Sequence, residues 1–357
     1  MALSSFTSSL RNLTLTVAAW LVTSAAAPGI EFSGVVAFGD SLTDRGNTIN
    51  LLGYTWAAPF TEYDETYYDY GNGRWSNGAT WVEYLNGNLL NGQTGSDPVD
   101  LGRNNGTEGA GTNFAWAGSL SGTGGKEIGP FQIHNMRTQV ELYTNLYNTT
   151  SFLPEISTTL FTIWTGGNDA IDWVKDGMNP DNMEAIAAAA AANIAAAISD
   201  LYDLGARYFL VPNLPGLGNK PDFAKDPEKR DAANAFAEYF NLTLAVNLDA
   251  LEASLSELTL FRLDVYSLFE DLLANPEAYN ISVTDQPAYV YDPAGSTVVS
   301  NPNDYAFWDN THPTTVIHQV LGDLAYQTVT IPEPGSLVFF GIGGAYVLAR
   351  RRFRKAA

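Results

Sequence analysis

A serine near the start of this chain directly follows an apolar run, in a setting that suits a nucleophile. The tetrapeptide Gly39-Asp40-Ser41-Leu42 comes after residues 34–38, which read GVVAF. A serine at the carboxyl end of a parallel strand lies where open α/β sheets bind their ligands. We expect Gly39 to allow a sharp turn, and a helix that begins just after Ser41 to direct its free N–H groups at the hydroxyl. Those donors would favour negative charge beside the nucleophile.

Serine is a weak nucleophile unless a neighbouring base takes its proton. The chain offers three histidines, His134, His312 and His318. Asp309 precedes His312 by three residues at the start of the last expected helix, so its carboxylate can hold the imidazole nitrogen that faces away from the serine. We assign His318, inside that helix, to packing or to the surface, and His134 has no evident chemical partner. The sequence therefore predicts that Ser41 pairs with His312.

Acyl transfer also requires hydrogen-bond donors for the negative oxygen of the tetrahedral intermediate. Asn168, in the segment GGND, follows the apolar run at residues 160–164 and is expected at the same sheet edge as Ser41. Gly118 ends the segment NFAWAG, and its lack of a side chain lets a backbone N–H approach closely. Together with Ser41 and His312, these two residues supply the parts of a serine acyl-transfer site.

Apolar runs bounded by Gly or Pro alternate with segments of helical periodicity along the body of the chain. Strands are predicted at residues 34–38, 160–164, 208–211 and 260–263, and helices at residues 80–85, 137–146, 183–204, 232–251 and 314–327. Strands separated by long helices indicate βαβ units and an α/β fold with a mostly parallel sheet. Such a sheet brings the carboxyl ends of its strands to one edge, where the segments named above would meet.

Composition excludes several classes of protein. The chain has 357 residues, of which 45% are hydrophobic and none is cysteine, so a disordered chain, a disulfide scaffold and a thiolate metal site are not expected. Its 18 basic and 39 acidic residues give a net charge of −21. Such a charge repels phosphate backbones, so nucleic acid is excluded as a partner. We also expect neither a metal nor an organic cofactor.

The two ends differ in composition from the body, so we divide the chain into residues 1–27, 28–331 and 332–357. The first part has one basic residue, an apolar run and small residues before Pro28, which is the layout of a secretory signal peptide. A permanent anchor is the alternative. The last part reads PEP, then an apolar stretch at residues 335–349, then a cluster of Arg and Lys. That stretch would span about 22 Å as a helix, less than the ~30 Å hydrocarbon core.

Residues 50–130 are rich in Gly, Asn and Tyr and contain no long periodic segment. A region of this kind in a compact fold is either a functional lid and binding surface or an insertion with little order. Its aromatic residues suit stacking on sugar rings and equally suit ordinary packing against the domain; they are Tyr54, Trp56, Tyr63, Tyr67, Tyr68, Tyr70 and Trp75.

Four blocks of sequence, taken in order, resemble the GDSL lipase/esterase (SGNH hydrolase) family. They are FGDSLTD at residues 38–44, NFAWAGS at 113–119, GGND at 166–169 and DNTH at 309–312. The resemblance implies a three-layer α/β/α, flavodoxin-like fold with a central, mostly parallel sheet. It further implies a catalytic triad of Ser41, Asp309 and His312, and an oxyanion hole formed by Ser41, Gly118 and Asn168.

One position departs from the family pattern, because Ala117 stands where many members have a second glycine. Asp40 and Asp44 also match the first block, and we interpret them as local hydrogen-bonding residues of the turn. The segments GRWSNG at residues 73–78, NLPGLG at 213–218 and FWDNTHPT at 307–314 resemble the long-form branch of the family. That resemblance points to small acyl esters or acetylated polysaccharide as substrates.

The tail at residues 332–357 resembles the PEP-CTERM sorting signal of Gram-negative bacteria. The resemblance implies an exported protein, extracellular or on the cell surface. It also implies that the tail contacts the inner membrane transiently, until an exosortase-like processing enzyme acts on it. An ordinary tail anchor is the alternative.

Three functional hypotheses follow. The first is a secreted serine ester hydrolase that forms an acyl-enzyme on Ser41. The second is a catalytically inactive surface carbohydrate-binding protein on the same fold, suggested by the aromatic residues between 50 and 130. The third, a metal hydrolase or an α/β-hydrolase, has little support because the chain contains neither His-Glu-x-x-His nor Gly-x-Ser-x-Gly.

Overall fold

Four parallel strands form the central sheet of the protein, in the order β1-β4-β5-β6. A computed structural model of the protein describes residues 30–51, 73–90, 111–149, 153–292 and 294–330. The strands are β1 (Gly34–Gly39), β4 (Thr159–Trp164), β5 (Tyr208–Pro212) and β6 (Thr259–Leu263). All three pairings between neighbours are parallel, and β1 and β4 are in register from Gly34↔Thr159 to Gly39↔Trp164. The expected α/β fold with a mostly parallel central sheet is confirmed.

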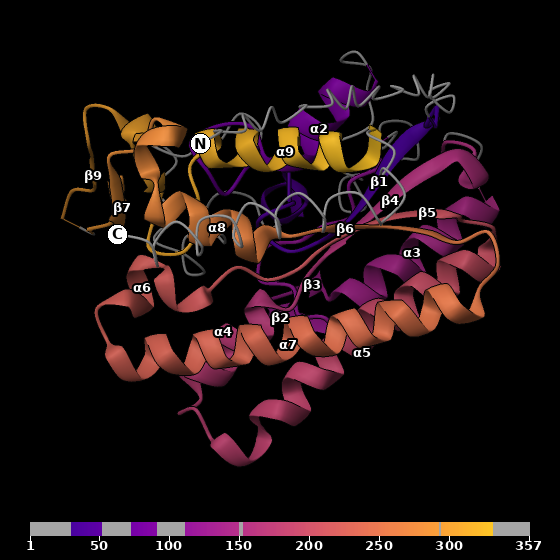
Figure 1. Ribbon diagram of the computed structural model, residues 1–357, viewed down its shortest axis with the longest axis horizontal. Helices are drawn as coiled ribbons and strands as arrows, with labels where there is room; N and C mark the ends of the chain where they lie inside the picture. The colour runs from indigo at the N-terminus through magenta and orange to yellow at the C-terminus, as the bar shows by residue number, and fades with distance from the viewer. Residues whose placement is uncertain (1–29, 52–72, 91–110, 150–152, 293, 331–357) are drawn as a thin grey trace, which may run out of the picture.

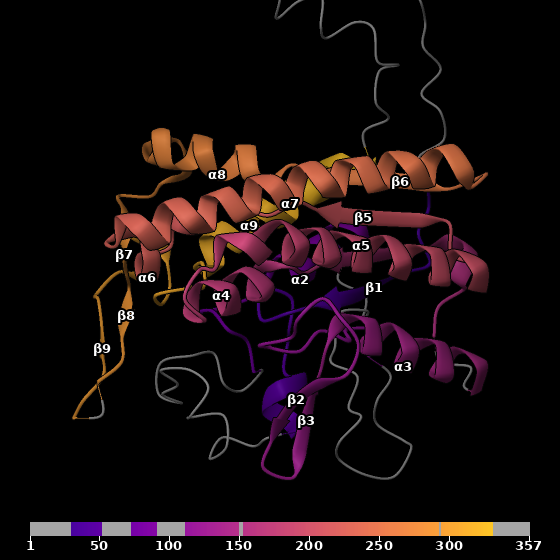
Figure 2. The same ribbon diagram turned by 90° about the horizontal axis from the view of Figure 1, so that it is seen from below.

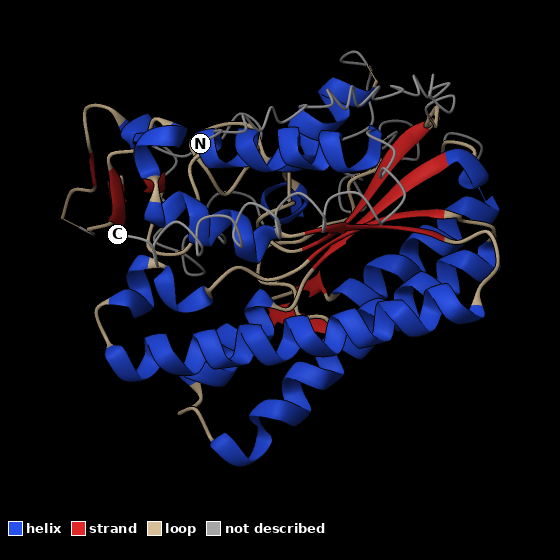
Figure 3. Ribbon diagram, viewed as in Figure 1, coloured by secondary structure: helices blue, strands red, loops and turns tan. Residues whose placement is uncertain are grey.

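Helices cover both faces of this sheet and make it the middle of three layers (Figures 1 and 2). One face packs against α3 (Met136–Thr149), α4 (Gly167–Lys175), α5 (Pro180–Leu204) and α7 (Pro227–Ser254). The other face packs against α2 (Trp81–Leu89), α8 (Val265–Ala274) and α9 (Thr315–Thr330). Figure 3 shows the strands fanned between these two sets of helices.

The period of two along each strand explains the two cores. In β1, Val36 and Phe38 belong to the core under α3, α5 and α7, whereas Val35 and Ala37 belong to the core under α2 and α9. A strand that is buried on both faces is apolar throughout, which is why β1 and β4 are recognisable in the sequence as short apolar runs. The sheet is thus enclosed on both sides, and its carboxyl edge is left for a site.

The chain leaves β1, crosses to the outer edge of the sheet, and later returns to β4. Residues 112–116 lie beside β1, where the Ala37 N–H donates to Thr112 O at 2.9 Å and the Phe114 N–H donates to Ala37 O at 2.7 Å. β1 is therefore flanked by this segment on one side and by β4 on the other. The chain leaves β1 toward one side of the sheet and leaves β4 toward the other. Connections that run in opposite directions in this way leave a crevice at the carboxyl ends of the strands.

Smaller elements surround the carboxyl edge. The hairpin of β2 (Gly125–Ile128) and β3 (Phe131–His134) lies below the sheet in Figure 2, and the chain after α8 forms β7 (Val283–Pro287), β8 (Tyr289–Val290), β9 (Thr297–Val298) and β10 (Tyr305–Phe307). The short helix α6 (Pro221–Ala224) belongs to this part as well. Among the described residues, 3₁₀ turns lie at Ile156–Thr158, directly before the amino end of β4, and at Leu217–Asn219, Pro276–Tyr279 and Pro302–Asp304. None of these short strands was expected from the sequence, because each is too short to show a period.

The alanine-rich helix α5 is long and apolar enough, by length and composition, to cross a membrane. Its apolar residues Ile194, Ile198 and Leu201 are fully buried against the sheet and the neighbouring helices. We therefore interpret α5 as a core helix of the domain, as the helical spacing of its isoleucines predicts.

Several regions interpreted from the sequence lie outside the described residues. They are the expected signal peptide at 1–27, the whole tail at 332–357, and residues 52–72 and 91–110 of the aromatic-rich region. Of the seven aromatic residues named there, Trp75 is described. It is 1% exposed and packs with Ile49, Ala117, Tyr289 and Trp308, so it serves as a core residue beside the site.

Candidate active site

Ser41 lies in a tight turn that follows directly on β1. The N–H groups of Thr43 and Asp44 donate to the Asp40 carbonyl, and the Leu42 N–H donates to the Asp40 carboxylate at 3.0 Å. The expectation that a helix begins just after Ser41 is wrong, because the next helical residues begin at Asn47. The turn is closed by the Asp40 carbonyl instead, and Ser41 lies at its corner, where it lines a cavity.

Gly39 is required by a close approach of the neighbouring strand. A Cβ at this position would lie 2.4 Å from the Trp164 carbonyl oxygen, a distance that no side chain tolerates. The end of β1 can therefore stay paired with the end of β4. Because both strands end at the same level, the Ser41 turn and the loop after β4 are adjacent.

Ser41, His312 and Asp309 form a continuous hydrogen-bonded series. The Ser41 Oγ lies 2.9 Å from His312 Nε2, and His312 Nδ1 lies 2.7 Å from Asp309 Oδ2. All three residues are buried, with Ser41 the most exposed at 8%. The structure thus brings a hydroxyl near the start of the chain to an imidazole near its end, in the arrangement that the sequence predicted.

The loop that carries His312 is fastened at several points. The N–H groups of Thr311 and His312 donate to Asp309 Oδ1 at 2.7 and 2.6 Å, and the Trp308 N–H donates to the His312 carbonyl. Burial acts to raise the pKa of Asp309, but the facing imidazole and these hydrogen bonds outweigh it and hold the pKa below its ordinary value. Asp309 is therefore a carboxylate that orients the ring and favours a positive charge on it.

The expected oxyanion donors line one cavity together with Ser41 and His312. Gly118 has a φ of +77°, a conformation that favours glycine, whereas the Ala117 N–H is already donated to Thr48 Oγ1 and to Asp44. Within the described ranges, the N–H groups of Ser41 and Gly118 donate to no protein acceptor. Many family members have a glycine at the position of Ala117. Here the Ala117 N–H holds the loop in place and Gly118 supplies the N–H that is unpaired among the described residues, so a glycine at 117 is not required.

Asn168 is brought to this cavity by the turn from β4 into α4. Its Nδ2 donates to the Ser119 carbonyl at 3.0 Å, which uses one of the two amide protons, and Asn168 lines the cavity that Ser41, Gly118 and His312 share. The next residue, Asp169, accepts hydrogen bonds from the N–H and the hydroxyl of Ser121. The loops that carry Gly118 and Asn168 are therefore joined to each other.

The other two histidines lie away from this series. His318 is fully buried in α9, where its Nδ1 accepts the Trp81 N–H at 3.2 Å, and burial lowers its pKa to about 3. It is a neutral packing residue, as predicted. His134 ends β3 and stands edge-on to Trp116, with ring centroids 5.2 Å apart. Neither histidine lines the two cavities that contain Ser41.

Asp40 and Asp44 hold the turn, as expected from the sequence. Asp44 accepts the N–H groups of Gly46 and Asn47 at 2.8 Å and the Ala117 N–H at 3.1 Å, so it ties the nucleophile turn to the loop of Gly118. Burial raises the pKa of Asp44 above its ordinary value and raises that of Asp40 to about 7.

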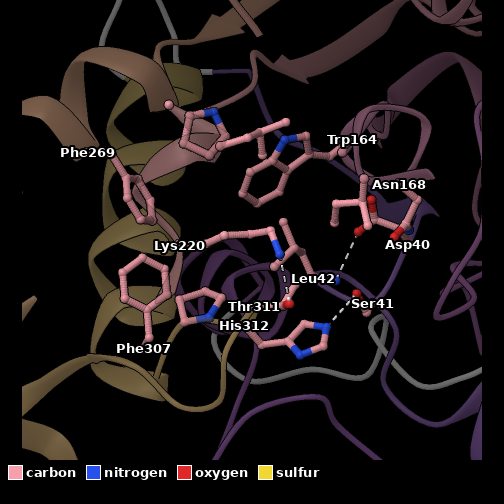
Figure 4. A pocket seen from close by; sticks show the side chains of 16 residues that line it. Asp40, Ser41, Leu42, Trp164, Asn168, Lys220, Phe269, Phe307, Thr311 and His312 are labelled. Atoms are coloured by element: carbon pink, nitrogen blue, oxygen red, sulfur yellow. Dashed lines mark hydrogen bonds between the residues drawn. The ribbon is translucent and has the colours of Figure 1, made fainter. Parts of the chain in front are cut away.

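Two cavities meet at Ser41 and His312 and have different linings. The first is largely apolar (Figure 4), with walls formed by Leu42, Trp164, Ile171, Leu217, Phe269 and Phe307. The second is more polar and is lined by Thr48, Gly118, Asn168, Asp172 and Lys175, among others. An ester bound across the serine therefore finds an apolar side and a polar side.

Sequence reasoning missed two buried polar residues at this site. Lys220 lines the apolar cavity, and nothing in the segment NKPD marks it. Gln139 lies on α3 among the buried residues Met136, Val140 and Tyr143, and a polar residue on that apolar face was the available signal.

A hydroxyl, an imidazole and a carboxylate in series, at the carboxyl edge of a parallel sheet and beside free N–H donors, define a serine hydrolase. The family profile described as GDSL-like Lipase/Acylhydrolase matches residues 35–325, and the chain belongs to that family. It is a carboxylic ester hydrolase.

Relatives of similar length share this family. A GDSL esterase/lipase of Arabidopsis thaliana is 26% identical over 324 residues, which cover 83% of this chain and 82% of the relative. A phosphatidylcholine-sterol acyltransferase of Aeromonas hydrophila is 28% identical, covering 82% of this chain and 89% of the relative. Acetylajmalan esterase 2 of Rauvolfia serpentina is 26% identical, covering 81% and 88%.

Among solved structures, an acetylxylan esterase of Geobacillus stearothermophilus is 13% identical, with a TM-score of 0.40 over 85% of this chain and 96% of that chain. A likeness of this size does not indicate a substrate.

Proposed function

We propose that this protein hydrolyses carboxylic esters through an acyl-enzyme on Ser41. The observation that carries the proposal is the 2.9 Å contact between Ser41 Oγ and His312 Nε2, continued by the 2.7 Å contact between His312 Nδ1 and Asp309. The contact places a base within reach of the hydroxyl proton. The three catalytic side chains are already in hydrogen-bond contact, so no rearrangement is needed to bring them together.

The reaction proceeds in two displacements. Ser41 Oγ attacks the ester carbonyl carbon while His312 Nε2 takes the hydroxyl proton, and the carbonyl oxygen becomes an oxyanion. The N–H groups of Ser41 and Gly118 and the Asn168 amide donate to that oxyanion. The C–O bond to the alcohol then breaks, and His312 returns the proton to the departing oxygen.

Water completes the cycle on the other side of the acyl-enzyme. His312 takes a proton from water, the resulting hydroxide oxygen bonds to the acyl carbon, and the bond to Ser41 Oγ breaks as the proton returns to the serine. The acid leaves and Ser41 is regenerated. Asp309 stabilises the imidazolium in both halves and keeps its own charge.

The substrates we propose are esters of short acyl groups, including acetylated carbohydrate. The polar cavity lined by Thr48, Asn168, Asp172 and Lys175 suits a hydroxyl-rich alcohol. The relative named acetylajmalan esterase 2 supports a small acyl group.

We further propose that the protein is exported by a Gram-negative bacterium and acts outside the cell or at its surface. The support is the signal-peptide layout of residues 1–27 and the PEP-CTERM-like order of residues 332–357. The tail would contact the membrane transiently until an exosortase-like enzyme processes it. Comparing the masses of secreted and cell-bound protein tests this, since processing removes the tail from the secreted form.

The experiment that tests the catalytic proposal is hydrolysis of 4-nitrophenyl acetate by the Ser41→Ala variant. We expect a loss of at least about 10³-fold in kcat, with the thermal unfolding temperature retained. Ser199→Ala is the matched control, because the Ser199 hydroxyl donates to the Ala195 carbonyl within α5 and Ser199 lines neither of the two cavities at Ser41. Hydrolysis by Ser41→Ala at the wild-type rate would show that another nucleophile acts, and a wild type without activity would favour the inactive carbohydrate-binding protein.

A further inference from the structure

Lys220 places an ammonium group in the wall of the apolar cavity beside the reacting residues. Its side chain is 5% exposed, and it lines the same cavity as Ser41 and His312. Figure 4 shows Lys220 extending from the side of Phe307 and Phe269 toward Thr311, the residue that precedes His312. A buried charge in an otherwise apolar wall is costly unless it is paired.

The protein pairs this ammonium with hydrogen-bond acceptors and with one aromatic face, since Nζ lies 3.7 Å from the centroid of the Phe223 ring. Lys220 Nζ donates to Asp222 Oδ2 at 3.0 Å and, at the longer distance of 3.4 Å, to Thr311 Oγ1. An ammonium has three protons to donate, and among the described residues these two are its hydrogen-bond acceptors. The Asp222 side chain is 42% exposed, so solvent screens its charge, whereas Lys220 is buried.

The rest of the cavity offers a ligand very little polar contact. Leu42, Trp164, Ile171, Leu217, Phe269 and Phe307 present carbon to it. Apart from the reacting groups, the hydrophilic side chains among the described residues that line this cavity are those of Asp40, Thr311 and Lys220, and Lys220 is the one that carries a positive charge. Thr311, which accepts from Lys220 Nζ, is adjacent in sequence to His312, and Lys220 lines the same cavity as the reacting residues.

We propose that the apolar cavity is the acyl site and that Lys220 makes it selective for short acyl groups that carry an oxygen acceptor, such as a carboxylate, a few atoms beyond the ester carbonyl. The alcohol then lies in the polar cavity on the other side of Ser41. This proposal rests on the proposed esterase function. A charge-assisted hydrogen bond from the ammonium compensates the acceptor for the water it loses on entering the cavity.

The test compares two esters of equal shape and different charge. The probes are 4-nitrophenyl hemisuccinate, whose acyl group ends in a carboxylate, and 4-nitrophenyl 4-methylpentanoate, which has two methyl groups in place of the carboxylate oxygens. Each is assayed with the wild type, with Lys220→Met, which removes the charge at similar volume, and with Lys220→Arg, which keeps it. Lys225→Met, at an exposed lysine outside both cavities, is the matched control.

We expect Lys220→Met to lower kcat/KM for the hemisuccinate by about tenfold or more and to change it for the methylpentanoate by less than about threefold. Lys220→Arg should retain more of the hemisuccinate activity than Lys220→Met. Equal losses on both esters would overturn the proposal, because Lys220 would then only anchor the loop of His312. A wild type that hydrolyses the methylpentanoate and not the hemisuccinate would also overturn it.

Failure of the proposed function gives a different result. Ser41→Ala would then hydrolyse both esters as the wild type does, whatever the Lys220 variants show.

A second observation, independent of Lys220, concerns Gln139 on α3. Its fully buried amide bonds both backbone groups of Gly39: Oε1 accepts the Gly39 N–H at 2.9 Å, and Nε2 donates to the Gly39 carbonyl at 2.8 Å. Nε2 also lies 3.0 Å from Ser119 Oγ and 2.9 Å from the His134 carbonyl. Gly39 is two residues before Ser41, and Ser119 follows Gly118.

We infer that Gln139 is a positioning residue that fixes the nucleophile turn relative to the Gly118 N–H. The Gln139 amide bonds to both loops, in addition to the Asp44 carboxylate that accepts the Ala117 N–H, so the spacing between the attacking oxygen and one oxyanion donor depends in part on it. Small errors in such spacing reduce the rate of the chemical step more than they reduce binding.

Gln139→Glu tests this, because a carboxylate has the same size and cannot donate to Gly39 or Ser119. The enzyme is titrated with a fluorophosphonate, so that kcat is expressed per reactive serine. We expect kcat per titrated site to fall about tenfold or more while KM stays within about threefold. Gln139→Met, which removes the amide without adding charge, should give a similar loss, and Gln327→Glu, at an exposed position on α9, should give none.

The inference would be overturned if both Gln139 variants kept the wild-type kcat per titrated site and lost only melting temperature or titratable fraction. That result would assign Gln139 to stability alone.

Discussion

Asp309 holds His312 through both of its carboxylate oxygens. Oδ2 lies 2.7 Å from His312 Nδ1, and Oδ1 accepts the backbone N–H of the same histidine at 2.6 Å. The spacing of three residues makes this double contact geometrically simple, since the chain turns once between the two side chains. The ring is thereby fixed relative to its own backbone, and Nε2 is left free to face Ser41.

Asp309→Asn should reduce kcat by about 10³–10⁴-fold. Asparagine has the same shape, but its amide no longer favours the imidazolium and can hold the ring in the wrong tautomer. The measurement is kcat for 4-nitrophenyl acetate at pH 8. A loss below about tenfold would contradict the role given to Asp309, and Asp323→Asn on the outer part of α9 is the control.

Asn168→Ala should reduce kcat by about 10²–10³-fold with little change in KM, because the oxyanion exists in the transition state and not in the bound ester. Steady-state kinetics on one ester measure both values. Asn88→Ala, at an exposed asparagine of α2, should behave as the wild type. A rise in KM with an unchanged kcat would show that Asn168 binds the ground state instead.

Asp40 predicts a pH dependence of stability. Burial raises its pKa from the ordinary 3.8 to about 7, so between these values the folded protein binds a proton that the unfolded chain does not. The stability that Asp40 contributes is therefore greatest at low pH and decreases as pH rises from about 4 to about 7. Asparagine at this position keeps a neutral acceptor for the Leu42 N–H and removes this dependence.

We therefore expect Asp40→Asn and the wild type to have similar unfolding free energies near pH 4, with the variant gaining about 2–4 kcal/mol relative to the wild type by pH 8. Urea unfolding at a series of pH values gives both curves. Parallel curves would mean that Asp40 ionises as readily in the folded protein as in the unfolded chain.

Glu83 connects the segment after the nucleophile turn to α2. Its carboxylate accepts from Arg45 Nε and Arg74 Nε, both at 2.7 Å, and from the Thr80 N–H at 2.9 Å. Burial acts to raise the pKa of Glu83, but the two guanidinium groups outweigh it and lower the pKa. The stability from this group is therefore present above its ordinary pKa and is lost as pH falls through the lowered value.

Glu83→Gln should lower the free energy of unfolding by about 3 kcal/mol at pH 7, because two largely buried guanidinium groups lose their carboxylate. The difference from the wild type should shrink at pH values below the ordinary pKa of glutamate, 4.5. Glu184→Gln, at an exposed position on α5, should change stability little at either pH. A Glu83 effect that does not depend on pH would contradict an ionic origin.

Much of the fold could be predicted from sequence because the elements that form it are long or apolar. β1 and β4 are buried on both faces and contain runs such as GVVAF and LFTIW, and α5 and α7 show helical spacing over many residues. Most predicted ends of the helices fell inside the observed ones, one coincided at residue 204, and the starts at residues 80 and 314 lay one residue outside; α7, for example, begins at Pro227, five residues before the predicted start. Capping by Asp226 fixes that start, and a period of apolar residues does not reveal a cap.

The site, like the fold, has features that the sequence predicts and features that it does not. Ser41, Asn168 and His312 each follow a recognisable strand or precede a helix, so their meeting at one edge could be predicted. The conformation of the Ser41 turn could not, since it depends on the Asp40 carbonyl accepting two N–H groups in place of a helix. Lys220 and Gln139 could not be assigned either, because their contacts join loops and helices from distant parts of the chain.

Mass spectrometry of the protein treated with a fluorophosphonate tests the central claim most directly. The account predicts one adduct per chain, located on the peptide that contains Ser41, absent in Ser41→Ala and formed far more slowly in His312→Ala. An adduct on a different residue, or labelling of Ser41 at the same rate without the imidazole, would contradict it.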